Sequence, residues 1–404
     1  MKKTAALLIT FALLTSLLIS CRNDEKNEEN SGEETNLSSE ASEPSFAAHE
    51  PEMTIFYVRV DKLRLRKEAG QTAETITAVP EGSFVTGTGE VSSFRDTIEL
   101  RGMYYREPYY KVVTSDPEPQ TGFMFGGGLQ PVYAGPAAGS PDMAKITELS
   151  KFLLSLPPSE LTSGAKAWEF VRKNFPKESP AVSDAAYILF SSFMRQMEVE
   201  GMFYSLVDQI EWKETDYEAI YLGKYDMSQN PITTSLSQNG FTLATTEGSI
   251  FPVVDQKALS DFFRNMVSPA MKEYIQLDLA EFQQPAMDDA GIIIPLEEYA
   301  NRSVAWEKFN SANPHFLLGS YTREHGHWMS LTLLSGVDNT PVADYETEKV
   351  SEDFEKVWEY ILQKYPETQL AGHIRNLQQI IQKAGGLYNS EARAYVDHLW
   401  EMEV

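Results

Sequence analysis

Residues 63–85 read LRLRKEAGQTAETITAVPEGSFV, and this stretch decides which kind of fold opens the protein. The two leucines of LRLR alternate with Arg64 and Arg66, so that apolar and basic side chains would lie on opposite sides of a strand. Pro80, Glu81 and Gly82 then interrupt two further apolar runs, a combination that is typical of a turn. Short strands separated by Gly and Pro predict a small all-β barrel over residues 54–132.

Two later segments extend this pattern, namely YYKVVT at 109–114 and TGFMFGGGL at 121–129. Together with residues 63–85 they resemble the bacterial SH3-like domain, in which an L-R-x-R strand, a Gly loop, an x-G-x-x-V turn and an aromatic-Y-K-V strand follow in this order. The chain departs from the family at Phe123-Met124, where Trp and Val are usual, and in an insertion at 92–108. The resemblance implies a module that binds cell-wall peptides or other envelope ligands.

The candidate ligand-binding residues of this module are aromatic and basic. Tyrosine suits a shallow groove because its ring is apolar and its hydroxyl is polar, and arginine can pair with a carboxylate through two hydrogen bonds. Segment 54–132 holds nine basic and ten acidic residues, so it is the least acidic folded part of the chain and suits an acidic ligand such as a cell-wall stem peptide. Alternatively, alternate residues of YYREPYYKV belong to the core and the others are scattered over the surface. The residues that we expect to bind are Arg64, Arg66, Tyr104, Tyr105, Tyr109 and Tyr110.

The N-terminus carries the pattern of an exported protein. Two lysines precede an apolar run at 4–19, which is short for a membrane span and suits a secretory signal peptide. The next residues, Leu-Ile-Ser-Cys at 18–21, resemble the bacterial lipobox, which implies cleavage after residue 20 and lipidation of Cys21. The alternative is a signal peptide, or an uncleaved anchor, with an incidental cysteine. Lipidation would anchor the protein to a bacterial membrane of the cell envelope, at the outer membrane or the cell surface.

Charge and cysteine count limit the possible partners and bonds. Residues 21–53 contain ten acidic and two basic side chains, which predicts a disordered acidic tether. The formal net charge of −25 argues against nucleic acid as a partner, because nucleic-acid binding requires a basic surface. With one cysteine, the chain cannot form an internal disulfide.

The remainder predicts a different kind of domain. A Pro/Gly linker at 133–141 leads into residues 142–404, which are mostly amphipathic helix. Trp-Glu pairs begin at Trp168, Trp306 and Trp358, and each precedes a proline by the same interval. An aromatic helix, a proline and a second helix resemble half of a tetratricopeptide-type pair, so we expect degenerate helical-pair repeats. The alternative is chance recurrence of Trp-Glu in helices.

Two further features complete the helical region. The segment NGFTLATTEGSIFPVVD at 239–255 predicts a small β insert, because its residues alternate on both sides of a Glu-Gly turn. In YTREHGHWM at 321–329, His325 and His327 would share one face of a strand and suit a transition metal, with a third ligand such as Asp338 or His315 from elsewhere. A surface loop is the favoured alternative, so no catalytic, cofactor-binding or metal-binding residue is assigned.

The sequence as a whole predicts a multidomain α+β protein with an SH3-like barrel followed by a helical domain. The expected function is that of a non-enzymatic cell-envelope lipoprotein, which uses the SH3-like domain to bind a cell-wall or envelope peptide or protein ligand. Its expected partners are the membrane, through the lipid anchor, and peptidoglycan or an envelope peptide, without a cofactor. The alternative is an envelope hydrolase or metal-binding protein that uses the SH3-like domain for targeting and has its site near His325 and His327.

Overall fold

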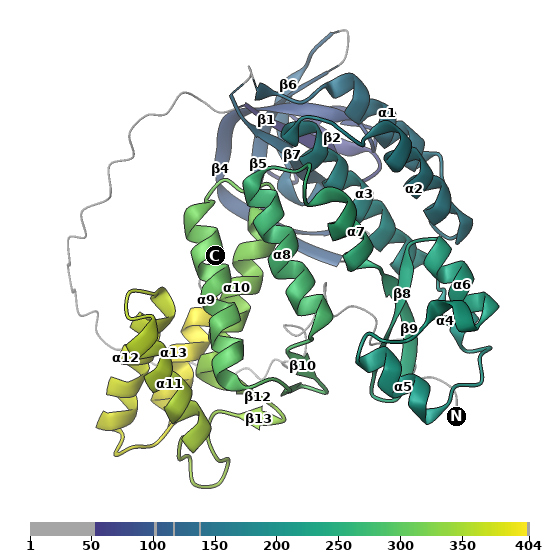
Figure 1. Ribbon diagram of the computed structural model, residues 1–404. Coiled ribbons are helices and arrows are strands. Elements are labelled where there is room, and N and C mark those ends of the chain that lie inside the picture. The colour runs from purple at the N-terminus through teal and green to yellow at the C-terminus, as the bar shows by residue number, and fades with distance from the viewer. Residues whose placement is uncertain (1–52, 101–102, 116–117, 137–138, 402–404) are drawn as a thin grey trace.

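The computed structural model describes residues 53–100, 103–115, 118–136 and 139–401 (Figure 1). The predicted signal peptide, Cys21 and the acidic tether lie outside the described residues. The described chain begins with an antiparallel sheet and continues as a mostly helical region, which confirms the α+β class.

The sheet contains seven strands in the order β3-β2-β6-β5-β4-β1-β7. Its edges are β3 and β7, so the sheet is open and not a closed barrel, and the SH3-like assignment stays a prediction. The strands are β1 (Met53–Val58), β2 (Leu63–Arg66), β3 (Thr75–Val79), β4 (Phe84–Leu100), β5 (Met103–Thr114), β6 (Thr121–Phe125) and β7 (Leu129–Gly135).

The sheet curls around a small core of its own. In β2 the side chains of Leu63 and Leu65 are buried while Arg64 is exposed, which confirms the predicted alternation. Apolar residues from all seven strands and from the turn after β1 meet on this inner side. They are Phe56, Val58, Val60, Leu63, Leu65, Val79, Val85, Val112, Met124 and Leu129.

The helical region surrounds a larger core. Its helices are α1 (Met143–Leu154), α2 (Thr162–Asn174), α3 (Pro180–Glu200), α4 (Tyr204–Val207), α5 (Glu214–Tyr221), α6 (Pro231–Gln238), α7 (Gln256–Phe263), α8 (Pro269–Gln283), α9 (Leu296–Ala312), α10 (Gly319–Ser335), α11 (Glu352–Lys364), α12 (Gln369–Lys383) and α13 (Ser390–Glu401). The predicted β insert is present as a hairpin of β8 (Phe241–Thr246) and β9 (Ser249–Val254). Two minimal hairpins, β10 (Met287–Asp288) with β11 (Gly291–Ile292) and β12 (Gly336–Val337) with β13 (Thr340–Pro341), flank α9 and α10.

The three Trp-Glu segments form helices, as predicted. Trp168, Trp306 and Trp358 lie in α2, α9 and α11, and all three are buried. Each helix ends two residues before its proline, which cannot continue a helix. The helices that follow α2 and α11 are capped, because the hydroxyls of Ser179 and Thr368 accept backbone N–H groups in the first turns of α3 and α12. In each case the Trp helix packs against its successor.

The sheet and the helices share apolar packing. Ile55, Phe84, Val132 and Tyr133 are buried in the same cluster as the helical core. The hydroxyl of Ser150 in α1 also donates to the carbonyl oxygen of Gly82, at 3.2 Å. Strand β7 thus continues three residues into the segment predicted as a linker at 133–141, because Tyr133 fills part of this interface.

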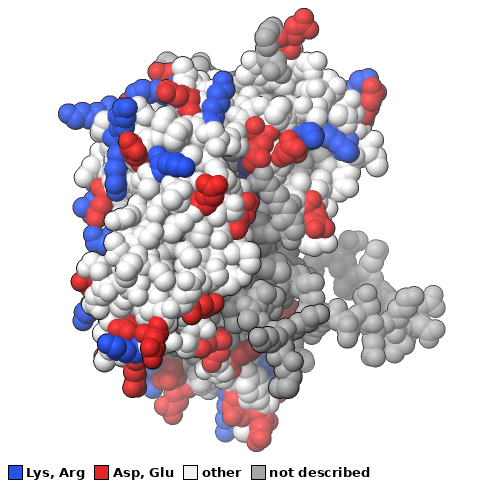
Figure 2. Space-filling view, turned by 90° about the vertical axis from the view of Figure 1, so that its right-hand side faces the viewer, with Lys and Arg blue, Asp and Glu red and all other residues white. Residues whose placement is uncertain are grey.

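Charge is distributed unevenly over the surface. Figure 1 shows α11–α13 and the α4–α6 group at opposite ends of the helical region. Figure 2 looks onto the side with α5 and α6, where basic side chains gather toward the upper left, acidic ones occur over the upper part and along the bottom, and an uncharged area lies between top and bottom. None of the described helices is long and apolar enough to cross a membrane.

Candidate ligand-binding surface

The predicted basic face of the sheet forms a row across three strands. Arg66 of β2 lies opposite Phe123 of β6, which in turn lies opposite Lys111 of β5. The ammonium of Lys111 is 5.6 Å from the centre of the Phe123 ring. The guanidinium of Arg66 donates to the carbonyl oxygen of Ala73 at 2.6 Å, whereas Arg64 is exposed. Arg64 is therefore the more accessible of the two predicted arginines.

Tyr109 is buried beneath this surface. Its side chain is 0% exposed, and its hydroxyl donates to a carboxylate oxygen of Asp96 at 2.7 Å. Its ring lies 6.0 Å from that of Phe94 and 5.6 Å from that of Phe125, centre to centre. Burial, with the hydrogen bond and charge of Asp96, raises the pKa of Tyr109. Tyr109 stabilises the sheet and is closed to a ligand in this structure.

The other three tyrosines differ in exposure. Tyr110 packs against the small core of the sheet, with its ring centre 5.1 Å from that of Phe56. Tyr105 is half-buried beneath the guanidinium of Arg59, which lies 4.7 Å from the ring centre. Tyr104 is 68% exposed. The structure therefore divides the tyrosine run into core and surface residues, and Tyr104 is the one of the four that is available.

The long β4–β5 hairpin carries two more exposed apolar side chains, which sequence reasoning missed. Val91 is 45% exposed and Phe94 is 46% exposed, although both belong to β4. Strand β1 pairs with β4 only as far as Thr86. Over the rest of β4, no described strand occupies the side that faces away from β5. A free strand edge next to exposed apolar side chains is a recognised template for binding an extended peptide.

The hairpin also meets the helical region at α10. Burial raises the pKa of Glu107 in β5, and the charge of Glu324 adds to the effect. The guanidinium groups of Arg95, Arg59 and Arg323 lower it, but they do not outweigh burial. Glu107 thus lies partly buried between the sheet and α10, where its ionised form destabilises the folded state.

The structure overturns the predicted placement of the two histidines. His325 and His327 lie in α10, and neither a strand nor a surface loop contains them. Residues two apart in a helix point in different directions, so the two rings do not share a face. The Nε2 atom of His327 lies 3.0 Å from the carbonyl oxygen of Leu399, on the side of α13. Across the described ranges, no group of three or more His, Cys, Asp or Glu side chains could hold a metal ion.

His325 instead pairs with a carboxylate from another helix. Its Nε2 atom is 3.4 Å from Oε1 of Glu281 in α8, and that same oxygen accepts the indole N–H of Trp306 at 2.7 Å. The imidazole stacks on Tyr321, with ring centres 5.9 Å apart and planes 11° apart. Burial opposes ionisation of Glu281, but the hydrogen bonds and charges around it prevail and lower its pKa. An ionised Glu281 can orient the imidazole, as carboxylates do in acid–base sites.

A second charged pair lies close to the first. Arg195 of α3 faces Asp278 of α8, with a nitrogen–oxygen distance of 3.8 Å, too long for a hydrogen bond. Burial raises the pKa of Asp278 despite the attraction of Arg195 and His325. The side chains of Arg195 and Asp278 remain 27% and 16% exposed, so water reaches a pair that is surrounded by Tyr187 and Tyr274. The cluster of Arg195, Asp278, Glu281 and His325 is the second candidate site.

Comparison with known protein families, curated proteins and solved structures gives no significant match. The functional argument therefore depends on the residues of this chain.

Proposed function

We propose that this protein is a non-enzymatic, lipid-anchored protein of the bacterial cell envelope, whose SH3-like sheet binds a peptide or protein ligand while its helices serve as an interaction body. The observation that supports it most is the β4–β5 hairpin, which combines a free strand edge with exposed Val91, Phe94 and Tyr104. A strand edge that no described strand covers offers unpaired backbone groups to an extended peptide.

The hairpin and the basic face are connected through Tyr109. The ring of Tyr109 contacts Phe94 of the hairpin, and the positive charge of Arg66 acts on its hydroxyl. An extended peptide paired with β4 would gain main-chain hydrogen bonds from the strand edge and apolar contact from Phe94. Acidic groups on such a peptide would be attracted by Arg64 and Arg66. A cell-wall stem peptide, which is short, extended and acidic, has this chemistry.

The anchor is a separate part of the proposal. Lipidation of Cys21 places the protein at a membrane, and the acidic segment 21–53 spaces the folded part from it.

The test is a titration of the chain from residue 22 onward with purified peptidoglycan fragments. Tyr104→Ala and Phe94→Ala are expected to weaken binding about tenfold each, the loss of about 1.4 kcal/mol that an aromatic anchor contributes. Tyr345→Ala is the matched control, because Tyr345 is 71% exposed, like Tyr104, but lies in the loop before α11. Binding that all three variants retain would place the ligand elsewhere, and a complete lack of binding would reduce the sheet to a spacer.

An envelope hydrolase is the second candidate function, and the Glu281–His325 pair is the observation that favours it. In that case the imidazole acts as general base and Glu281 orients it. Incubation with peptidoglycan fragments, followed by mass spectrometry, would detect cleavage products. His325→Gln should abolish such cleavage, while His373→Gln, which changes another half-buried histidine, should not.

A further inference from the structure

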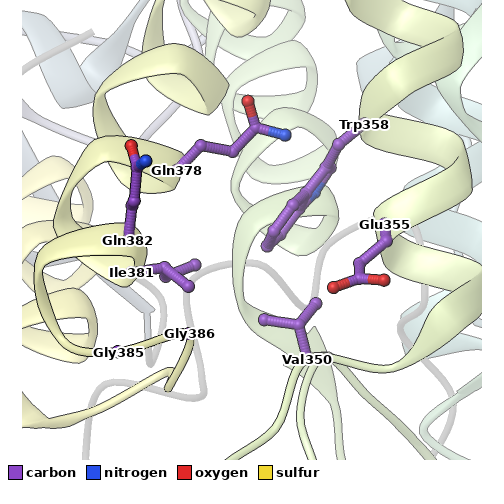
Figure 3. A pocket seen from close by; sticks show the side chains of 8 residues that line it. All are labelled: Val350, Glu355, Trp358, Gln378, Ile381, Gln382, Gly385 and Gly386. Atoms are coloured by element: carbon purple, nitrogen blue, oxygen red, sulfur yellow. The ribbon is translucent and has the colours of Figure 1, made fainter.

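A groove with a volume of about 390 Å³ separates α11 from α12 (Figure 3). Trp358, which is 2% exposed, forms the floor of the groove on the side of α11, Ile381 lines it from α12, and Val350 closes one end. This volume lies within the range of about 300–1,000 Å³ that is usual for small-ligand sites. The walls are apolar, and the rim carries a few polar groups.

Backbone contacts hold this groove open. Lys349 and Leu387 form an isolated β-bridge beneath it, and the N–H of Tyr388 donates to the carbonyl oxygen of Glu348 at 2.7 Å. Gly386, at φ 91°, lies beyond the end of α12, so no side chain covers the rim at that point. The groove is therefore a fixed feature of the helical pair.

Two polar side chains face the groove without a partner of their own. Figure 3 shows the carboxylate of Glu355 pointing into the space between the helices, while Gln378 reaches across from α12 toward Trp358. No hydrogen bond or ion pair among the described residues involves the side chain of Glu355 or Gln378. By contrast, Glu352 and Asp353 in the same turn of α11 both pair with Lys356, at 3.5 and 3.4 Å. Unlike these neighbours, Glu355 therefore has a carboxylate that can pair with an external group.

The charge of the site favours a cation. No basic side chain lines the groove, and the C-terminal end of α12, which carries partial negative charge, lies at its rim. Residues 343–365 contain seven acidic and three basic side chains. This excess of negative charge outweighs the partial positive charge at the N-terminal end of α11. The indole N–H of Trp358 already donates to the carbonyl oxygen of Leu333 at 2.7 Å, so it is not free to bind an anion.

We infer that this groove binds a lysine side chain presented by an extended peptide segment of a protein partner. The four methylenes of a lysine stem would pack against Ile381 and Val350, above the buried Trp358, because such stems pack along apolar surfaces. The ammonium would donate to the carboxylate of Glu355. The amide of Gln378 can donate to and accept from a peptide backbone. This site is independent of the hairpin surface on the sheet.

The test uses the chain from residue 22 onward and the peptide acetyl-Gly-Lys-Gly-amide, followed by saturation-transfer NMR, which detects millimolar binding. The peptide should bind, and its counterparts with Nε-acetyl-lysine or norleucine should bind at least tenfold more weakly, because they lack the charge. Glu355→Gln should weaken the lysine peptide about tenfold, since it removes a charged acceptor and keeps the shape. Glu352→Gln is the control and should have no effect, because Glu352 lies in the same turn and is 88% exposed.

The inference fails if the lysine and norleucine peptides bind equally, because the groove would then recognise only apolar surface. It also fails if Glu355→Gln leaves the affinity unchanged, or if no peptide binds at millimolar concentration.

Discussion

The three buried tryptophans allow one substitution to be compared at three sites. Trp358 donates its indole N–H to the carbonyl oxygen of Leu333, and Trp306 donates to Glu281, both at 2.7 Å. The indole N–H of Trp168 has no partner among the described atoms, although Trp168 is 3% exposed. Changing each to Phe removes the same atoms but breaks a hydrogen bond at only two of the sites.

We expect Trp358→Phe to lower the free energy of unfolding by about 1–3 kcal/mol more than Trp168→Phe does. All three changes share a packing loss, within the range of about 0.5–3 kcal/mol that is common for a single substitution. Trp358→Phe in addition leaves a buried carbonyl without a donor, which costs about 1–3 kcal/mol. Trp168→Phe removes an unpaired buried donor and so relieves a cost. The guanidinium of Arg172 lies 4.5 Å from the centre of the Trp168 ring, and a Phe ring would largely keep this contact.

Trp306→Phe adds a dependence on pH. Its hydrogen bond helps to lower the pKa of Glu281, so this bond stabilises the folded state above the pKa of an unfolded glutamate, about 4.3. The stabilisation is lost as the pH falls through the lowered pKa of folded Glu281. The cost of Trp306→Phe should therefore be larger at pH 7 than below pH 4, whereas that of Trp358→Phe should change little.

Urea unfolding of the full chain would measure these differences, provided that the denaturant dependence stays the same among the variants. If the three substitutions cost the same, or if Trp168→Phe costs the most, the argument from hydrogen bonding is wrong.

Three further predictions follow from other residues. Gly372→Ala should stabilise the protein by about 0.5–1 kcal/mol, because a methyl group there meets open space in α12. Gly164→Ala should destabilise it, because the methyl would overlap the backbone carbonyl of Asn239, and thermal unfolding of the two variants would show shifts of opposite sign. Glu107→Gln should raise the urea midpoint at pH 7, since burial makes the charged form costly, and this gain should vanish as the pH falls to about 4, where the unfolded carboxyl is also protonated; an equal gain at both pH values would contradict it. Mass spectrometry of the mature N-terminus should show an acylated Cys21, and an unmodified Cys21 on a correctly cleaved chain would refute lipidation.

Local patterns predicted the elements of this fold well. The alternation in LRLR and the prolines after the Trp-Glu helices depend on neighbours in sequence, and the structure confirms them. The extent of β7 was harder to predict, because Tyr133 continues the strand only where helices bury it. A Pro- and Gly-rich sequence gives no sign of such a partner.

The exposure of the tyrosines shows the same limit at the predicted site. Strand alternation correctly places Tyr109 and Tyr110 on opposite faces of β5, but it does not indicate which face other residues cover. Tyr109 is buried because the distal part of β4 brings Phe94 and Asp96 against it. Since residues 92–108 interrupt the family pattern, their path over the sheet could not be predicted from that resemblance.

The charged cluster between the helices depends on contacts that a single sequence does not reveal. His325 lies 44 residues from Glu281 in sequence, and the two meet only because α8 and α10 both pack against α9. Sequence reasoning selected His325 for its spacing from His327, which proved irrelevant once both were in a helix. The relevant feature is instead the carboxylate of Glu281, which accepts hydrogen bonds from both Trp306 and His325. Because ionised Glu281 already has these two donors, a ligand in this region would have to compete with them, whereas Glu355 in the α11–α12 groove has none to lose. Measured binding of cations should therefore be more sensitive to Glu355 than to Glu281.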